Sequence, residues 1–301
     1  MPELPEVQTT VDGLNQYTKG LTITDVWTSY KSPHHKGKDN IKDPVYFKQF
    51  KQIVLNQTIL HTKRRAKNIL IFLSNDYIIL AHMKMTGHFL YGTYTQTKTT
   101  WVPTDKKSSL ANNASRFIRL VFTLSNGQCL AFSDLRKFAK VTLIHKKDLD
   151  TSLHLKDLGP EPLDSSFTLD IFKERILLRP KGKIKQVLLD PSIIVGIGNI
   201  YSDEILFRAH IHPERIVSSL TNKELKAIFD ALKATLQKGI DFGGDSTSDY
   251  RNILGEAGVF QESHLAYRRT NSPCSKKGCK GIIVRKKIGS RNAHFCNTHQ
   301  I

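Results

Sequence analysis

The stretch Leu158-Gly159-Pro160-Glu161-Pro162 divides this 301-residue sequence into two parts with different patterns. Two prolines and a glycine within five residues interrupt helices and sheets alike, so the stretch is expected to be a linker. Short β-rich runs precede it, and helical patterns follow it. Strands and helices segregated in this way are typical of the α+β class, and the sequence therefore predicts a multidomain α+β protein.

The part before the linker, residues 1–157, begins with one expected helix and continues with strands. Residues 5–19 place apolar side chains at helical spacing, with Pro5 in the first turn and Gly20 after the end. β-rich runs separated by polar turns then predict an antiparallel sandwich or barrel. The expected strands are residues 21–27, 53–60, 68–73, 77–80, 117–124, 129–132 and 139–144, and residues 93–113 are expected to form a long loop.

The part after the linker is predicted to contain a helical domain, residues 158–263, and a small terminal domain, residues 264–301. The expected helices are residues 167–178, 183–189, 199–209 and 222–238, and residues 241–246 are expected to be a flexible loop. The terminal domain contains nine Lys or Arg residues and no Asp or Glu.

Composition restricts the class of partner. A formal net charge of +18 and a sequence pI near 9.7 favour a polyanion, either a nucleic acid or an anionic membrane. No apolar run approaches the roughly 20 residues that span a bilayer, and the acidic, proline-containing N-terminus differs from a signal peptide. We therefore expect a cytoplasmic, nucleoid-associated protein in which cysteines stay reduced and clustered cysteines bind metal.

Three of the four cysteines form a metal-binding pattern near the C-terminus. Cys274 and Cys279 are followed, after sixteen residues, by Cys296 and His299. Two such pairs can close a tetrahedron around one structural Zn²⁺, which leaves no open coordination position for catalysis. His294 remains an alternative to His299 as the fourth ligand. Chance burial of the thiols is the competing interpretation, but the spacing and the basic surroundings favour zinc.

The N-terminus offers a nucleophile. Removal of Met1 would expose the secondary amine of Pro2, and α-amino groups have pKa values of about 7.7–8.0, against about 10.4 for lysine. A larger neutral fraction at pH 7 makes such an amine suited to covalent catalysis at a sugar carbon. Glu3 and Glu6 lie three residues apart beside it and could act as acid or base. The simpler explanation is that glutamates at a helix start stabilise the helix dipole.

Six segments, in order from residue 2 to residue 299, carry a resemblance to a known family. They are Pro2-Glu3-Leu4-Pro5-Glu6-Val7, Arg64-Arg65-Ala66-Lys67, His82-Met83-Lys84-Met85-Thr86-Gly87, Asp134-Leu135-Arg136-Lys137-Phe138, Val195-Gly196-Ile197-Gly198-Asn199-Ile200-Tyr201 and the terminal finger. The sequence thereby resembles the formamidopyrimidine-DNA glycosylase family, in the group that also includes endonuclease VIII. The resemblance implies an N-terminal β-sandwich with flanking helices, a helix-two-turn-helix domain around Asn199 and a zinc-finger β-hairpin.

The resemblance also implies bifunctional chemistry. Pro2 would displace the damaged base and open the sugar as a Schiff base. Glu3 would donate the proton for base release, with Glu6 in support. Lys67 would assist β-elimination, and Arg291 would assist δ-elimination.

A second group of residues would bind the DNA. A glycosylase must flip its target base out of the duplex, and wedge residues fill the gap. Met85 and Phe138 match the family's wedge, and Arg136 would pair with the orphaned base. Phosphate contacts are implied for Lys137, Lys181, Lys185 and Asn199. Core packing of the apolar residues and solvation of the lysines are the ordinary alternatives.

We therefore predict a monomeric base-excision repair glycosylase and AP lyase that removes oxidised purines, including 8-oxoguanine and formamidopyrimidines, from double-stranded DNA. An endonuclease VIII-like enzyme for oxidised pyrimidines and a non-catalytic zinc-containing DNA-binding protein are the alternatives. The sequence departs from the family at the four-residue spacing of the first cysteine pair, at His299, at Ala139 and at Phe117. The last two concern contacts with DNA.

Overall fold

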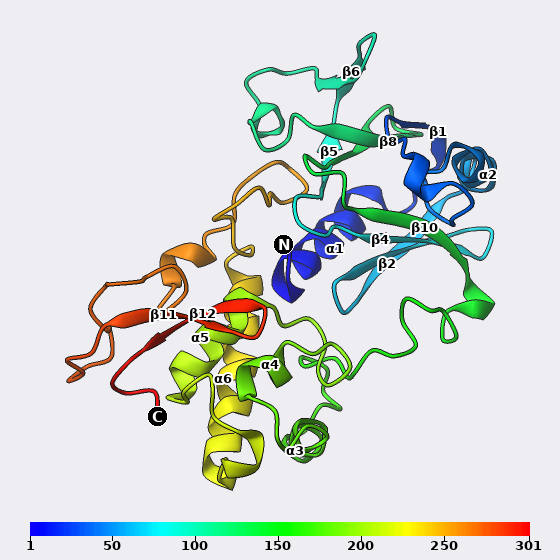
Figure 1. Ribbon diagram of the computed structural model, residues 1–301. Helices are drawn as coiled ribbons and strands as arrows, with labels where there is room; N and C mark the ends of the chain where they lie inside the picture. The colour runs from blue at the N-terminus through cyan, green and yellow to red at the C-terminus, as the bar shows by residue number, and fades with distance from the viewer. The chain divides into compact units, whose positions relative to one another are not determined.

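The computed structural model describes residues 1–301, which form two compact units (Figure 1). The first unit consists of Met1–Lys156 and Phe242–Val259, and the second of Asp157–Asp241 and Phe260–Ile301. This division differs from the predicted one in two respects. Phe242–Val259 folds with the first unit although it follows the helices in sequence, and the terminal finger forms one unit with the helices instead of a separate domain.

The first unit is the predicted β-sandwich. One antiparallel sheet has the strand order β1-β8-β9-β5, and the other has the order β10-β4-β3-β2. A small hairpin, β6-β7, lies apart from both sheets. The elements are α1 (Leu4–Thr18), β1 (Ile23–Thr28), η1 (Pro33–His35), α2 (Pro44–Val54), β2 (Ile59–Arg65), β3 (Asn68–Leu73), β4 (Tyr77–His82), β5 (His88–Gly92), β6 (Tyr94–Gln96), β7 (Trp101–Pro103), η2 (Ser109–Ala111), β8 (Ile118–Leu124), β9 (Cys129–Ser133), β10 (Lys140–His145) and η3 (Lys146–Asp148).

A single apolar core joins the two sheets to helix α1. Val7, Val11 and Leu14 are buried at helical spacing and share a cluster with Ile71 of one sheet and Phe122 of the other. Each such side chain, once fully buried, contributes about 1.5–3 kcal/mol to folding. The start of α1 is therefore fixed firmly on the sandwich.

Three elements of the first unit differ from the sequence prediction. Helix α2 was not predicted, and the expected strand at residues 53–60 is wrong because Ile53 and Val54 end α2 and the strand begins at Ile59. Asp43 caps this helix by accepting a hydrogen bond from the Val45 amide at 3.0 Å. Strand β5 was also missed, and the expected loop at residues 93–113 contains the β6-β7 hairpin.

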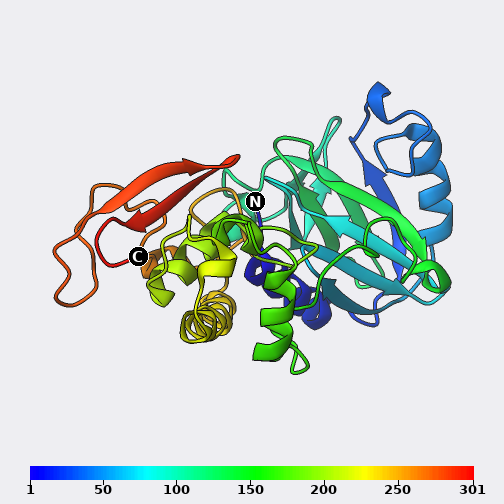
Figure 2. The same cartoon turned by 60° about the horizontal axis from the view of Figure 1, so that its bottom comes forward.

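The second unit combines helices with a two-stranded hairpin. The four predicted helices are present, and α5 has the predicted bounds. Helix α5 packs against α4, α6 and strand β12, so the hairpin lies along the helices (Figure 2). No helix of the protein combines the length and the apolar character needed to cross a membrane. The elements are α3 (Leu169–Leu177), α4 (Ile184–Leu188), α5 (Asn199–Ala209), η4 (Val217–Ser219), α6 (Asn222–Asp241), η5 (Phe260–Ser263), β11 (Ile283–Ile288) and β12 (Arg291–Cys296).

Candidate functional site

The start of helix α1 brings Pro2, Glu3 and Glu6 together. Glu3 occupies the N-cap position, and Glu6 three residues later completes a capping box. Glu6 Oε2 accepts a hydrogen bond from the Glu3 amide at 2.6 Å. Both glutamates are almost fully buried, with 3% and 1% of their surface exposed. A buried carboxylate needs such partners, and the capping box supplies them directly beside the predicted nucleophile.

The segment Phe242–Val259 braces this helix start from within the same unit. Its Asp245 amide donates to Glu6 Oε1 at 2.7 Å, and the Tyr250 hydroxyl donates to the Glu6 carbonyl at 3.0 Å. Gly244 has φ +86°, and a Cβ there would lie 2.9 Å from Glu6 Cγ. The expected loop at residues 241–246 is a loop from Phe242 onward, and hydrogen bonds to Glu6 hold its second half. The paired glycines Gly243 and Gly244 were the available signal for a close backbone approach.

Lys67 lies in the tight turn between β2 and β3, where Ala66 has the left-handed φ of +56°. The Arg64 side chain donates to Gln8 Oε1 at 2.9 Å, which ties this hairpin to α1. His82, on the neighbouring strand β4, has its pKa lowered to about 3, first by burial and then by the charges of Lys84 and Lys67. His82 is thus a neutral donor or acceptor in a cationic setting, a feature that sequence reasoning missed.

The predicted wedge residues lie on two loops of the first unit that one carboxylate holds together. Asp134 is fully buried, and its Oδ1 accepts a hydrogen bond from Thr86 Oγ1 at 2.6 Å. Its Oδ2 accepts from the Tyr30 hydroxyl at 2.8 Å and from the Ala139 amide at 3.0 Å. Thr86 Oγ1 in turn accepts from the Arg136 amide at 3.0 Å. The loop before β5 and the loop before β10 are therefore fixed to each other.

These loops expose the side chains that the resemblance assigned to DNA. Met85 is 38% exposed and Phe138 is 52% exposed, so neither is the core residue of the alternative interpretation. The Arg136 guanidinium lies over the Phe138 ring, 4.5 Å from its centroid. Lys137 is exposed, and its backbone has φ +56°. An apolar ring, an apolar thioether and a flat cation thus share one exposed surface.

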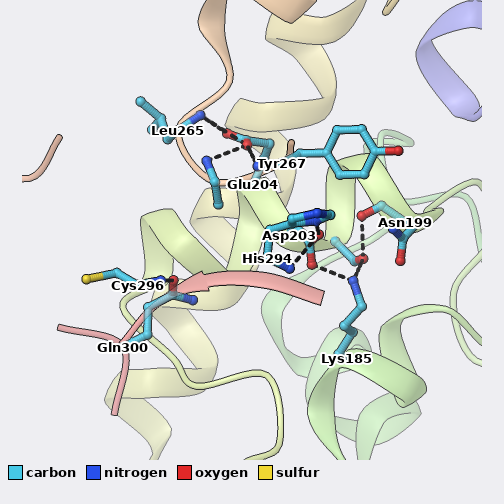
Figure 3. A network of polar contacts seen from close by, with 11 residues as sticks. Lys185, Asn199, Asp203, Glu204, Leu265, Tyr267, His294, Cys296 and Gln300 are labelled. Carbon is cyan, nitrogen blue, oxygen red and sulfur yellow. Dashed lines mark hydrogen bonds and ion pairs between the residues drawn. The ribbon is translucent and has the colours of Figure 1, made fainter. Parts of the chain in front are cut away.

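In the second unit, Lys185 is not at the surface, where a phosphate contact would require it. Its side chain is fully buried, and its ammonium forms a very short ion pair with Asp203 and a 3.1 Å hydrogen bond to Ser202 Oγ (Figure 3). The ammonium has no exposed surface, and moving it toward a phosphate would cost the buried ion pair with Asp203. This geometry therefore gives no support to the predicted phosphate contact by Lys185. Lys181, by contrast, is exposed, and Asn199 begins α5.

Two adjacent acids of α5 fix the terminal finger to the helices. Asp203 Oδ2 accepts from the His294 amide and from His294 Nδ1, each at 3.0 Å. Glu204 accepts hydrogen bonds from the amides of Leu265, Ala266 and Tyr267 at 2.9–3.1 Å (Figure 3). Sequence reasoning missed both acids, because helical periodicity does not distinguish a buried acid from a solvated one.

The terminal cysteines and His299 form a compact cluster whose ligand atoms all lie within 4.8 Å of one another. Cys274 Sγ lies 3.2 Å from His299 Nδ1, and Cys279 Sγ lies 3.7 Å from Cys296 Sγ. Nε2 of His299 faces the Phe207 carbonyl at 3.4 Å, which leaves Nδ1 as the metal-facing nitrogen. His294 is the less suitable fourth ligand, because its Nδ1 faces Asp203. The donor set fits one tetrahedral metal ion.

Arg291 begins β12 and is exposed, directly after the turn of the hairpin. That turn contains Gly289, with φ +59°, and a Cβ there would lie 2.4 Å from Gln186 Nε2 of α4. The hairpin end is therefore held close to α4. Arg291 is therefore an exposed cation on a hairpin end that packs against α4.

The comparisons with known proteins agree with this arrangement of a β-sandwich, a helical unit and a Cys₃His finger. The formamidopyrimidine-DNA glycosylase N-terminal domain matches residues 1–141, and the formamidopyrimidine-DNA glycosylase H2TH domain matches residues 158–251. A formamidopyrimidine-DNA glycosylase of Pelotomaculum thermopropionicum is 36% identical over 300 residues, which cover 100% of this chain and 99% of that protein.

Solved structures give the same result. The Lactococcus lactis Fpg in complex with a Fapy-dG-containing DNA has a TM-score of 0.82 and 28% identity, with 99% of both chains covered. The same protein in complex with an oxidised pyrimidine-containing DNA has a TM-score of 0.81 and 28% identity at the same coverage. Fold and site thus define a DNA glycosylase with a zinc-finger-like hairpin. The chain belongs to the formamidopyrimidine-DNA glycosylase family.

Proposed function

We propose that this protein excises oxidised purines from duplex DNA and then nicks the strand through an iminium ion formed at Pro2. Family membership supports the substrate class, and the observation that carries the chemistry is the position of Pro2 beside two buried, hydrogen-bonded glutamates at the start of α1. A pure DNA-binding protein would need neither the terminal proline nor these acids. The alternative of a non-catalytic zinc protein is therefore disfavoured.

The proposed reaction begins after removal of Met1. The Pro2 nitrogen attacks C1′ of the damaged nucleoside, and the C1′–N bond to the base breaks while Glu3 provides the proton that the leaving base needs. Ring opening of the sugar gives an iminium at Pro2. Loss of a C2′ proton then expels the 3′ phosphate, and a second elimination expels the 5′ phosphate. Lys67 would assist the first elimination and Arg291 the second.

The remaining residues would position the DNA. Phe138 and Met85 would fill the space of the flipped base, and Arg136 would engage the orphaned partner base. Lys137, Lys181 and Asn199 would contact phosphates, which fixes register without reading sequence. We expect the protein to act as a monomer.

The metal of the finger is proposed to be one structural Zn²⁺ held by Cys274, Cys279, Cys296 and His299. Three backbone amides, those of Lys276, Gly281 and Thr298, point at the cysteine sulfurs at 3.3–3.4 Å. Such donors stabilise thiolates, the form in which cysteine binds metal. Bound zinc would supply folding energy to the hairpin rather than chemistry.

The test is borohydride trapping on a duplex with 8-oxoguanine opposite cytosine. We expect a covalent adduct whose peptide map places DNA on the terminal proline, and Glu3→Gln should lose base excision but retain cleavage at preformed abasic sites. An adduct at Lys67 would show that the nucleophile is wrong. Because the L. lactis protein has been solved with an oxidised pyrimidine, a pyrimidine-lesion duplex serves as the second substrate. A higher single-turnover rate on that duplex would favour the endonuclease VIII-like alternative.

A further inference from the structure

A basic cavity of about 560 Å³ opens beside Phe138 in the first unit. Its size falls within the range of ligand-binding pockets, roughly 300–1,000 Å³. The loop after η1, the turn before β5, the start of β10 and the segment before the linker all contribute to it. Its basic side chains are His35, Lys38, Lys42, Lys84, Lys140 and His154, and Asp39 is the only acid that lines it. None of these basic residues has a role in the reaction proposed above.

The cationic groups of this cavity repel one another. Burial lowers the pKa of Lys42 and of Lys140, and the nearby charge of Lys84 lowers both further. The pKa of His35 is lowered by burial and then by Lys42 and Lys38. A bound anion would relieve this repulsion and would stabilise the protonated forms.

Some of the lysine ammonium groups that line the cavity have no acceptor within the protein. The Lys42 ammonium donates to the Lys137 carbonyl at 2.7 Å, and Lys140 Nζ lies 3.3 Å from His154 Nδ1. Lys38 and Lys84 form no ion pair, and Lys38 is exposed while Lys84 is half-buried. Two ammonium groups therefore remain for an external acceptor, while Lys42 ties the cavity wall to the loop that carries Phe138.

We infer that this cavity binds a backbone phosphate of the undamaged DNA strand, close to the base step that Phe138 enters. The inference rests on the proposed wedge role of Phe138, since that ring lines the cavity and belongs to the loop assigned to the orphaned base. A wedge inserted from this loop brings the backbone of the same strand to the adjoining cavity. Lysine contacts of this kind hold the strand without sequence preference.

The first experiment measures binding to a duplex with a tetrahydrofuran abasic analogue over a range of salt. Lys38→Ala and Lys84→Ala should each lower the log–log slope, by about 0.9 in total, which is the value for one phosphate contact. Lys48→Ala is the matched control, because Lys48 is an exposed lysine of α2 that does not line the cavity. Equal slopes for Lys84→Ala, Lys38→Ala and Lys48→Ala would overturn the inference.

The second experiment locates the phosphate. Single methylphosphonates are placed along each strand near the lesion, and each is tested with the native protein and with Lys84→Ala. One position in the undamaged strand should weaken native binding and have no further effect on the variant. The assignment would be overturned if the only methylphosphonate whose effect disappears in Lys84→Ala lay in the lesion strand. It would also be overturned if the effects of Lys84→Ala and of the methylphosphonate simply added at every position. Titration with inorganic phosphate distinguishes a site for free anions, which would bind phosphate yet leave the DNA slopes unchanged.

These results are separable from the proposed function. Borohydride trapping by the native protein tests the chemistry, whereas the slopes use an analogue that cannot be excised. A native protein that fails to trap but shows the coupled methylphosphonate position would lose the proposed reaction and keep this phosphate site.

Discussion

Replacing Asp134 by Asn is the sharpest test of how the protein holds its wedge. The carboxylate accepts three hydrogen bonds in a fully buried position, one on Oδ1 from Thr86 and two on Oδ2 from Tyr30 and Ala139. An amide has one acceptor oxygen, so its NH₂ group must face at least one of these donors. Hydrogen bonds to charged groups are worth about 1.5–3 kcal/mol each. We therefore expect Asp134→Asn to destabilise the two loops by about 2–3 kcal/mol.

Hydrogen exchange at the Ala139 and Arg136 amides measures this local loss, because global unfolding of a two-unit protein is not a two-state process. A loss of about 2–3 kcal/mol corresponds to roughly 30- to 150-fold faster exchange, at 1.36 kcal/mol per factor of ten. Tyr30→Phe is the control that removes one donor and leaves the carboxylate, and it should give a smaller change.

Single-turnover excision of 8-oxoguanine supplies the functional readout. Arg136 is expected to discriminate cytosine from adenine in the opposite strand by about 1–3 kcal/mol, as a bidentate contact does. Asp134→Asn should reduce that preference because it loosens the loop that carries Arg136. Arg136→Ala should remove most of the preference because the side chain itself is lost. If Asp134→Asn kept both the slow exchange and the full preference, Asp134 would not be the residue that positions the wedge.

Three further changes test other parts of the molecule. Cys296→Ser should lose the metal, measured by elemental analysis, and should weaken DNA binding, while near-ultraviolet circular dichroism of the sandwich aromatics stays the same. Asp203→Asn should retain the metal but raise the ratio of β- to δ-elimination product on sequencing gels, because the hairpin with Arg291 loses its anchor; an unchanged ratio would argue against anchoring. Burial lowers the pKa of His88 from 6.5 to about 4, so the native state binds fewer protons than the unfolded state. This contribution is complete above pH 6.5 and falls by about 3 kcal/mol as the pH drops toward 4. His88→Gln should flatten the dependence of the melting temperature on pH over that window, and an equally steep profile would refute the assignment.

Local patterns explain what the sequence could predict. Helix α5 was predicted with its observed bounds because its apolar spacing and the preceding glycine are local signals. The three cysteines were predicted as ligands because two close pairs can reach one ion in almost any fold. His299 was predicted as the fourth ligand with His294 as the alternative, and the geometry favours His299 because His294 Nδ1 faces Asp203.

Long-range partners explain what the sequence could not predict. In the sequence Lys185 does not differ from the other basic residues. Only the structure shows that it forms a buried ion pair with Asp203, eighteen positions later. Residues 242–259 join the first unit through hydrogen bonds to Glu6 that span more than two hundred positions. Helix α2 was missed because its apolar residues Ile53 and Val54 also suit a strand. For Lys185 and for residues 242–259, the deciding contacts lie farther along the chain than a local sequence pattern extends.

Buried carboxylates hold in place the segments that carry the predicted functional residues. Glu6, Asp134, Asp203 and Glu204 are each at most 1% exposed, and each joins segments distant in sequence. Glu6, Asp203 and Glu204 do so through backbone amides, and Asp134 does so through the hydroxyls of Thr86 and Tyr30. A carboxylate can accept several such bonds at once, and bonds to an ionised acceptor are the stronger kind. In a protein with net charge +18 that must meet a polyanion, acids at the surface would oppose binding. Placed inside, the same acids fix the supports of Pro2, Phe138 and Arg291, while exposed cations such as Lys137 and Lys181 remain available to DNA.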